Sequence, residues 1–163
     1  MLIKNASLPT KTGLKNVDIV IDNGMIVSVE PTAVSAVDTQ SLDATGLIVL
    51  PGFVDLNVRF SNSVLNQGHI DKLASRCLRG GVTTAVVMSD FKPRLESATL
   101  LELVKFKIDQ AVIDMHMSAP LADQHADQLH DVATLLNNGA SAILANSNRN
   151  ANLTPTFELR SFW

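Results

Sequence analysis

The amino-acid sequence predicts an α/β protein in which a parallel sheet follows a short all-β region. Two patterns lead to this prediction. From about residue 51 onward, apolar runs alternate with segments of helical periodicity, which is typical of a parallel sheet with helical cover. These apolar runs show little polar alternation, as expected for strands that are buried on both faces. Before residue 51 there are strands and tight turns but no convincing helix.

The segment 1–50 is predicted to be a small β-region. Residues 2–8 form a first strand, and residues 16–30 form a hairpin with an Asn-Gly turn at 23–24. Asn-Gly favours a tight turn because both residues tolerate a positive φ angle. Residues 41–52 add one more strand.

The segment 51–163 is predicted to form four βα units. Apolar residues at helical spacing mark the helices, as Leu101, Val104 and Ile108 do in the second one. The predicted strands are 53–58, 82–88, 112–121 and 140–146, and the predicted helices are 69–81, 96–109, 127–139 and one that begins at Thr154.

Composition narrows the possible functions. Hydrophobic residues make up 46% of the chain and charged residues 18%, so a core can form. The net charge of -3 supplies no basic excess for nucleic acid or an anionic membrane. Cys77 is the only cysteine, which excludes an internal disulfide and fits a reducing cytoplasm. Without a signal-peptide pattern or a membrane-length apolar run, we expect a cytoplasmic protein.

Four βα units are half of a closed barrel. An eight-stranded barrel needs about 200–250 residues, whereas only 113 of the 163 residues follow residue 50. A half barrel has two open sheet edges, which are prone to aggregate unless they are covered. We therefore expect either a piece of a longer protein or a chain that completes itself with a partner, for which a homo-oligomer is plausible.

Two separated motifs resemble the dihydroorotase branch of the amidohydrolase superfamily. That branch typically reads Asp-Ala-x-Gly-x-x-Val-x-Pro-Gly-x-x-Asp before its metal-binding strand, and Gly-Gly-x-Thr-Thr followed by Met-Pro-Asn-Thr-x-Pro after the first helix. The first motif is matched by Asp43, Ala44, Gly46, Val49, Pro51, Gly52 and Asp55, and the second by Gly80, Gly81, Thr83, Thr84, Met88 and Pro93.

The resemblance implies the N-terminal half of a (β/α)8 TIM-type barrel, preceded by part of a small β-sandwich. In active relatives one or two zinc ions sit in the barrel and drive the reversible hydrolysis of a cyclic amide. The metal activates a bound water and polarises the carbonyl of the substrate.

At the positions that correspond to metal ligands, the sequence departs from the family. The two histidines of the first barrel strand correspond to Asn57 and Arg59. Asparagine is a weak neutral ligand, and arginine stays protonated without a lone pair to give. The bridging carboxylate or lysine falls near Ala145 and Asn146. The expectation is therefore that no ordinary metal site and no catalytic residue is present.

The substrate-binding positions are degenerate as well. The family's carboxylate-binding arginine corresponds to Ser61, and its substrate-binding asparagine corresponds to Asp90. A negative Asp90 would repel an anionic substrate. We hypothesise that Arg59 pairs with Asp90 at the mouth of the barrel, so that a guanidinium replaces the charge of the metal.

Other ligand-type side chains are interpreted as structural. His116 is expected to be a hydrogen-bonded strand residue between Asp114 and Ser118 in the alternation. The other histidines, His69, His125 and His130, are assigned to surface, cap or loop positions.

Sulfur-containing residues are assigned to the core. Cys77 lies on an apolar helix face, where Arg76 and Arg79 would favour its thiolate, but the sequence supplies no base for a nucleophile. Met115 and Met117 are expected to be core residues rather than a soft-metal site.

Three hypotheses about function remain. The preferred one is a non-catalytic dihydroorotase-like subunit of pyrimidine biosynthesis, a pseudoenzyme that acts as a scaffold for aspartate transcarbamoylase, as the resemblance implies. The second is an active zinc-dependent cyclic amidohydrolase whose altered site is completed by a missing C-terminal part. The third is a truncated fragment without activity of its own.

Overall fold

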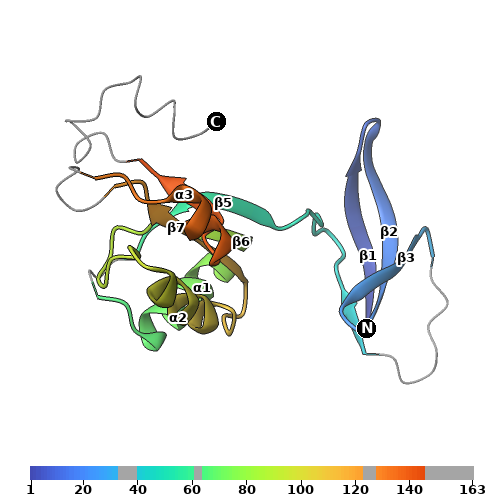
Figure 1. Cartoon of the computed structure of the whole chain (residues 1–163). Coiled ribbons are helices and arrows are strands. Elements are labelled where there is room, and N and C mark those ends of the chain that lie inside the picture. Colours follow the sequence, from blue (N-terminus) through green and yellow to red (C-terminus); the bar gives the residue numbers. More distant parts are fainter. Residues whose placement is uncertain (33–39, 61–63, 123–127, 146–163) are drawn as a thin grey trace. The chain divides into compact units, whose positions relative to one another are not determined.

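The computed structural model describes residues 1–32, 40–60, 64–122 and 128–145 (Figure 1). The chain divides into two compact units, and the boundary falls between Pro51 and Gly52. None of the helices in the described ranges has the length and apolar character that a membrane crossing needs.

The first unit is a four-stranded sheet with the order β3-β2-β1-β4. Neighbouring strands are antiparallel except for β1 and β4, which are parallel. The predicted hairpin turn is confirmed, because Asn23 and Gly24 have φ angles of 48° and 77°. The strands are β1 Leu2–Thr10, β2 Gly13–Asp22, β3 Met25–Glu30 and β4 Ser41–Asp43.

The predicted strand 41–52 was too long, because a turn ends β4 at Asp43. The carboxylate of Asp43 accepts hydrogen bonds from the backbone N–H and the hydroxyl of Thr45, at 3.0 and 2.6 Å. Gly46 then has a φ angle of 79°, which an L side chain rarely adopts. The hydrogen bonds from Thr45 and Asn5 lower the pKa of Asp43. Asp43 and Gly46 of the first motif therefore shape a turn.

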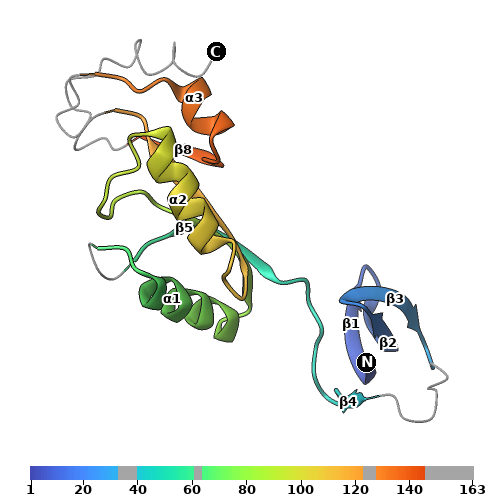
Figure 2. The ribbon, with the colours of Figure 1, turned by 60° about the horizontal axis from the view of Figure 1, so that its bottom comes forward.

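The second unit is a parallel sheet with the order β5-β6-β7-β8, joined by helices (Figures 1 and 2). This order confirms the predicted α/β class. Helix α1 contacts β6 and α2 contacts β7, and α2 also contacts both other helices. The elements are β5 Phe53–Val58, α1 Gln67–Arg79, β6 Val82–Val87, α2 Ala98–Ile108, β7 Asp114–Pro120, α3 Val132–Asn137 and β8 Ala142–Leu144.

The third helix is shorter than predicted and starts at Val132 instead of residue 127. The residues before it are tied to the end of β7, since the N–H of His130 donates to the carbonyl of Leu121 at 2.9 Å. Asp131 then caps the helix by accepting from the N–H of Thr134 at 3.2 Å. The helix predicted from Thr154 lies outside the described residues.

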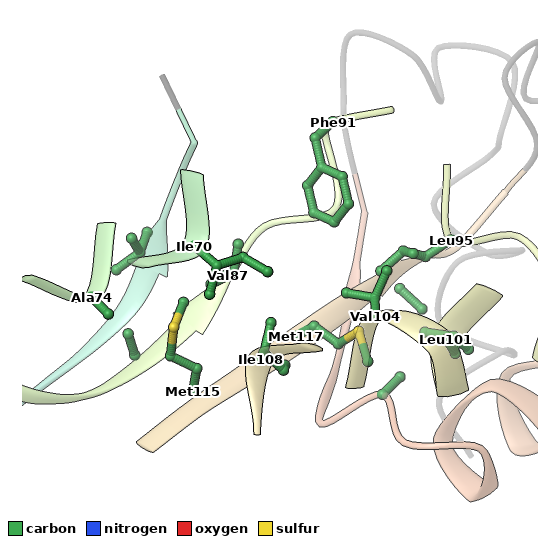
Figure 3. Close-up of a cluster of buried hydrophobic side chains, with 14 of the residues drawn as sticks. Ile70, Ala74, Val87, Phe91, Leu95, Leu101, Val104, Ile108, Met115 and Met117 are labelled. Atoms are coloured by element: carbon green, nitrogen blue, oxygen red, sulfur yellow. The ribbon is translucent and has the colours of Figure 1, made fainter. Parts of the chain in front are cut away.

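The core of the second unit lies between the sheet and its helices (Figure 3). Leu101, Val104 and Ile108 of α2 are buried there, as the helical spacing predicted. Met115 and Met117 of β7 are 4% and 1% exposed, so their assignment to the core is confirmed.

The two motifs meet where β5 begins beside β6. The backbone N–H of Phe53 donates to the carbonyl of Gly81 at 2.8 Å. Gly81 has a φ angle of 79°, and a Cβ atom there would lie 3.4 Å from the ring of Phe53. A Cβ atom on Gly52 would lie only 2.0 Å from Oγ1 and 2.7 Å from Cβ of Thr83. Glycine at position 52 is therefore a packing requirement of the parallel sheet.

We predict that Gly52→Ala destabilises the second unit by about 1–3 kcal/mol, because the added methyl overlaps the side chain of Thr83. Urea unfolding measures the change. Gly68→Ala is the matched control, since a Cβ atom there meets only Asn66 at 3.5 Å. The loss of stability caused by Gly52→Ala should be smaller in a protein that also carries Thr83→Gly. An equal loss of stability with and without Thr83→Gly would contradict the proposed overlap.

Candidate functional site

The candidate site lies at the C-terminal end of β5, the end of a parallel strand at which α/β proteins place their chemistry. Val58, the last residue of β5, is 8% exposed and belongs to the core beneath the helices. Asn57 and Arg59, the residues on either side of Val58, are both exposed. The Oδ1 atom of Asp55 accepts a hydrogen bond from the backbone N–H of Asn57 at 3.0 Å.

Arg59 forms an ion pair with Asp90, through Nη1 and Oδ2. The predicted pairing is thereby confirmed. The Arg59 side chain is 50% exposed and that of Asp90 is 29% exposed. Exposed ion pairs contribute about 1 kcal/mol or less to stability. The importance of the pair is therefore its position, because it fixes a positive group beside the end of β5.

Two further contacts join the same loops, and sequence reasoning missed both. The rings of Phe60 and Phe91 pack edge to face, with centroids 5.3 Å apart and an angle of 85° between their planes. The backbone N–H of Leu65 donates to the carbonyl of Lys92 at 2.9 Å. The matching Arg-Phe and Asp-Phe dipeptides after β5 and β6 were the signal that could have revealed the paired loops.

The described residues do not fit a zinc ion at this position. Zinc in proteins is held by thiolate, imidazole and carboxylate groups. Asn57 and the guanidinium of Arg59 supply none of these, and Asp90 already pairs with Arg59. Across the described ranges, no group of three or more His, Cys, Asp or Glu residues is placed to hold a metal. The side chain of Ala145 has no donor atom, and Ser61 and Asn146 lie outside the described residues.

His116 is a hydrogen-bonded strand histidine, as predicted. Its Nε2 atom lies 3.2 Å from Oδ2 of Asp114, and its Nδ1 atom lies 3.2 Å from Oγ of Ser141. The contact with Ser141 was not foreseen, because Ser141 comes from the segment before β8. Ser141, His116 and Asp114 lie at or near the N-terminal ends of β7 and β8, opposite to the end that carries Arg59.

Of the other histidines, His69 and His130 lie within the described residues, and they are not part of a metal-binding cluster there. Nδ1 of His69 lies 2.7 Å from the carbonyl oxygen of Val64, near the start of α1. Nε2 of His130 is buried without a hydrogen-bond partner among the described residues. His125 lies outside the described ranges.

Cys77 differs from the sequence-based expectation. The flanking Arg76 and Arg79 were expected to favour its thiolate. Instead, burial raises the pKa of the Cys77 thiol, and the negative charge of Asp55 raises it further. Cys77 packs partly buried against the core of the second unit, so its assignment to the core is confirmed.

The sequence is similar to curated dihydroorotases. Those of Streptococcus pneumoniae serotype 4 and Streptococcus pyogenes serotype M1 are each 30% identical over 146 residues. The chain is a distant homologue of the dihydroorotases. The match covers 86% of this chain but 34% of each relative, so the chain spans about a third of their length. No protein-family model matches the sequence.

Solved structures show the same fold for this dihydroorotase homologue. L-hydantoinase (dihydropyrimidinase) from Arthrobacter aurescens matches with a TM-score of 0.68 at 20% identity, over 87% of this chain and 32% of that chain. D-hydantoinase from a Thermus species matches with a TM-score of 0.57 at 23% identity, over 74% of this chain and 27% of that chain. The parallel sheet is therefore a half barrel, as predicted.

We predict that Cys77 reacts slowly with iodoacetamide in the folded protein, because the reactive species is the thiolate and the pKa of the thiol is raised. The rate should rise steadily as the pH is raised above neutrality. Asp55→Asn should increase the rate about two- to fivefold at a fixed pH by removing a nearby negative charge. Mass spectrometry measures the alkylation.

Asp71→Asn serves as the matched control, since this carboxylate lies on the same helix but does not contribute to the pKa shift of Cys77. Its rate should equal that of the unchanged protein. Alkylation of native Cys77 as fast as that of a free thiol at neutral pH would be incompatible with the raised pKa.

Proposed function

We propose that this chain is a non-catalytic dihydroorotase-like protein that acts as a structural subunit in pyrimidine biosynthesis. The observation that carries the proposal is the ion pair between Arg59 and Asp90 at the end of β5. By resemblance, Arg59 stands where an active relative carries a metal-binding histidine. A protonated guanidinium held at this point disfavours a divalent cation, because the two positive charges repel each other.

The roles of the matched motif residues support the same proposal. Asp43 and Gly46 shape a turn, Gly52 allows β5 to approach Thr83, and Gly81 adopts a positive φ angle. Each of these roles concerns the fold. The positions that correspond by resemblance to metal ligands and substrate contacts are the ones that differ from the family pattern. This is the pattern expected when a fold is maintained after its reaction is lost.

The negative charge of Asp90 also opposes the expected substrate. Dihydroorotate carries a carboxylate, which in active relatives is matched by arginine and asparagine side chains. At the corresponding position this chain presents Asp90, which is 29% exposed and engaged with Arg59. Any anion that approaches Arg59 must therefore compete with a carboxylate already bound to it.

Aspartate transcarbamoylase is the proposed partner. This choice rests on the resemblance to non-catalytic dihydroorotase-like proteins that serve as scaffolds for that enzyme. A structural subunit needs a stable surface rather than a metal, and the buried core between the sheet and its helices supplies the rigid base for one.

The second candidate function is an active cyclic amidohydrolase, favoured by the 30% identity to dihydroorotases. The remaining two thirds of such a relative could supply further ligands, but they could not remove Arg59 from the end of β5. A fragment without activity is the third possibility, and the intact mass of the protein from its native source addresses it.

We predict that the purified chain holds no stoichiometric zinc and does not convert dihydroorotate, because Asn57 and Arg59 cannot replace two histidine ligands. Elemental analysis measures the metal, and the absorbance of dihydroorotate measures turnover. The dihydroorotase of Streptococcus pneumoniae, prepared in the same way, is the positive control. One zinc ion per chain together with turnover would overturn the proposal in favour of an active enzyme.

We further predict that the chain co-elutes with aspartate transcarbamoylase from the same organism in size-exclusion chromatography with light scattering. Ovalbumin in place of the transcarbamoylase is the control for non-specific association. Separate elution at micromolar concentrations would remove the partner assignment, while the absence of zinc and turnover would still stand as a separate result.

A further inference from the structure

A serine, a histidine and an aspartate form a hydrogen-bonded row at the start of β7 and β8. Nδ1 of His116 lies 3.2 Å from Oγ of Ser141, and Nε2 of His116 lies 3.2 Å from Oδ2 of Asp114. Asp114 is the first residue of β7, and Ser141 immediately precedes β8. This Ser-His-Asp row lies at the opposite end of the strands from Arg59, and the motifs shared with dihydroorotases do not include it.

The backbone holds the serine beside the histidine. Strands β7 and β8 are parallel, with Ser118 opposite Ala142. The backbone N–H of Ser141 donates to the carbonyl of Met117 at 2.8 Å. Serine and histidine have short side chains with few rotatable bonds, so the pairing of the strands sets the distance between the hydroxyl and the imidazole of His116.

The aspartate determines which nitrogen of the imidazole carries the proton. An ionised carboxylate only accepts hydrogen bonds, so Nε2 of His116 donates to Asp114. In the neutral imidazole, Nδ1 then has the free lone pair and accepts from the hydroxyl of Ser141. The proton of the serine therefore points at a base whose other nitrogen is held by a carboxylate. This is the arrangement that activates a hydroxyl as a nucleophile.

The row is accessible to small reactants. The side chains of His116 and Asp114 are 40% and 66% exposed, and Ser141 is exposed as well. A second pair of serines, Ser89 and Ser118, differs in both respects, because it is buried and joins one hydroxyl to another. Ser141 thus combines a hydroxyl, a base and access from solvent.

We propose that Ser141 is a reactive serine that accepts the acyl group of small activated carboxylic esters, with His116 as its base. Oγ of Ser141 attacks the carbonyl carbon of the ester while its proton passes to Nδ1 of His116. The bond from this carbon to the leaving oxygen then breaks, and the proton on His116 goes to the leaving group. Asp114 stabilises the imidazolium that forms between these steps. Water hydrolyses the acylated serine and restores the hydroxyl.

An activated ester is the substrate class that the geometry favours. The backbone N–H of Ser141 already donates to Met117, so it is not available to stabilise a developing oxyanion. A good leaving group, such as a phenolate, compensates for this missing donor. The inference is independent of the proposed function, because neither zinc nor dihydroorotate enters it.

The first test exposes the chain to an alkyl fluorophosphonate, which bonds to an activated serine through phosphorus and releases fluoride. Mass spectrometry of the intact chain and of its peptides should place one label on Ser141. His116→Gln should slow the labelling about tenfold or more by removing the base. Ser41→Ala, which changes an exposed serine of β4, is the matched control and should leave the rate unchanged.

Circular dichroism shows that each variant is folded before the rates are compared. Absence of the label from the folded, unchanged protein would overturn the proposal. Equal labelling rates with and without His116→Gln would also overturn it, because the histidine would then not act as the base.

The second test measures p-nitrophenolate release from p-nitrophenyl acetate and locates the acetyl group by mass spectrometry. The acetyl group should be found on Ser141, and Ser141→Ala should abolish this acylation. Acetylation of His116 at an undiminished rate in the Ser141→Ala variant would overturn the proposal, since the imidazole itself would then be the nucleophile.

Asp114 acts through His116, so it is a positioning residue and its test is spectroscopic. The ¹⁵N chemical shifts of the His116 ring should show the proton on Nε2 in the unchanged protein. In Asp114→Asn the carboxamide can donate to Nε2, so the proton should move to Nδ1 and fluorophosphonate labelling should fall about tenfold. A neutral ring with its proton on Nδ1 in the unchanged protein would contradict the assigned roles.

Discussion

The approach of β5 to β6 is the constraint on which the second unit depends. The backbone of Gly52 lies so close to Thr83 that no side chain fits between them, and Phe53 bonds to the carbonyl of Gly81 at the same point. This contact sets where the first parallel strand starts. Arg59 follows the other end of the same strand, seven positions after this glycine.

The structure shows what several of the motif residues do for the fold. The motif positions shared with dihydroorotases lie at turns and close contacts. There, hydrogen-bonding side chains or glycines allow the backbone conformation that is observed. At the end of β5 the chain instead links two loops through an ion pair and an aromatic pair. These contacts hold the two loops against each other.

Much of the fold could be predicted from the sequence, because the periodicity of buried residues is a local signal. Strand β5 and the apolar face of α2 were found with good boundaries, whereas α3 was overestimated. The residues before α3 are held by a backbone hydrogen bond from His130 to Leu121. A single hydrogen bond of this kind does not change the periodicity of apolar residues, so the sequence pattern could not reveal it. For the candidate site, opposite charges suggested the pairing of Arg59 with Asp90. The direction of the pKa shift of Cys77 was predicted wrongly, because the prediction considered only the adjacent arginines in the sequence. In the structure, burial and the charge of Asp55 raise this pKa.

The pairing of Arg59 with Asp90 also has an evolutionary consequence. Replacing Arg59 by histidine would leave the Asp90 carboxylate without its guanidinium. The two positions are therefore energetically coupled, and a substitution at one of them changes which residues are tolerated at the other.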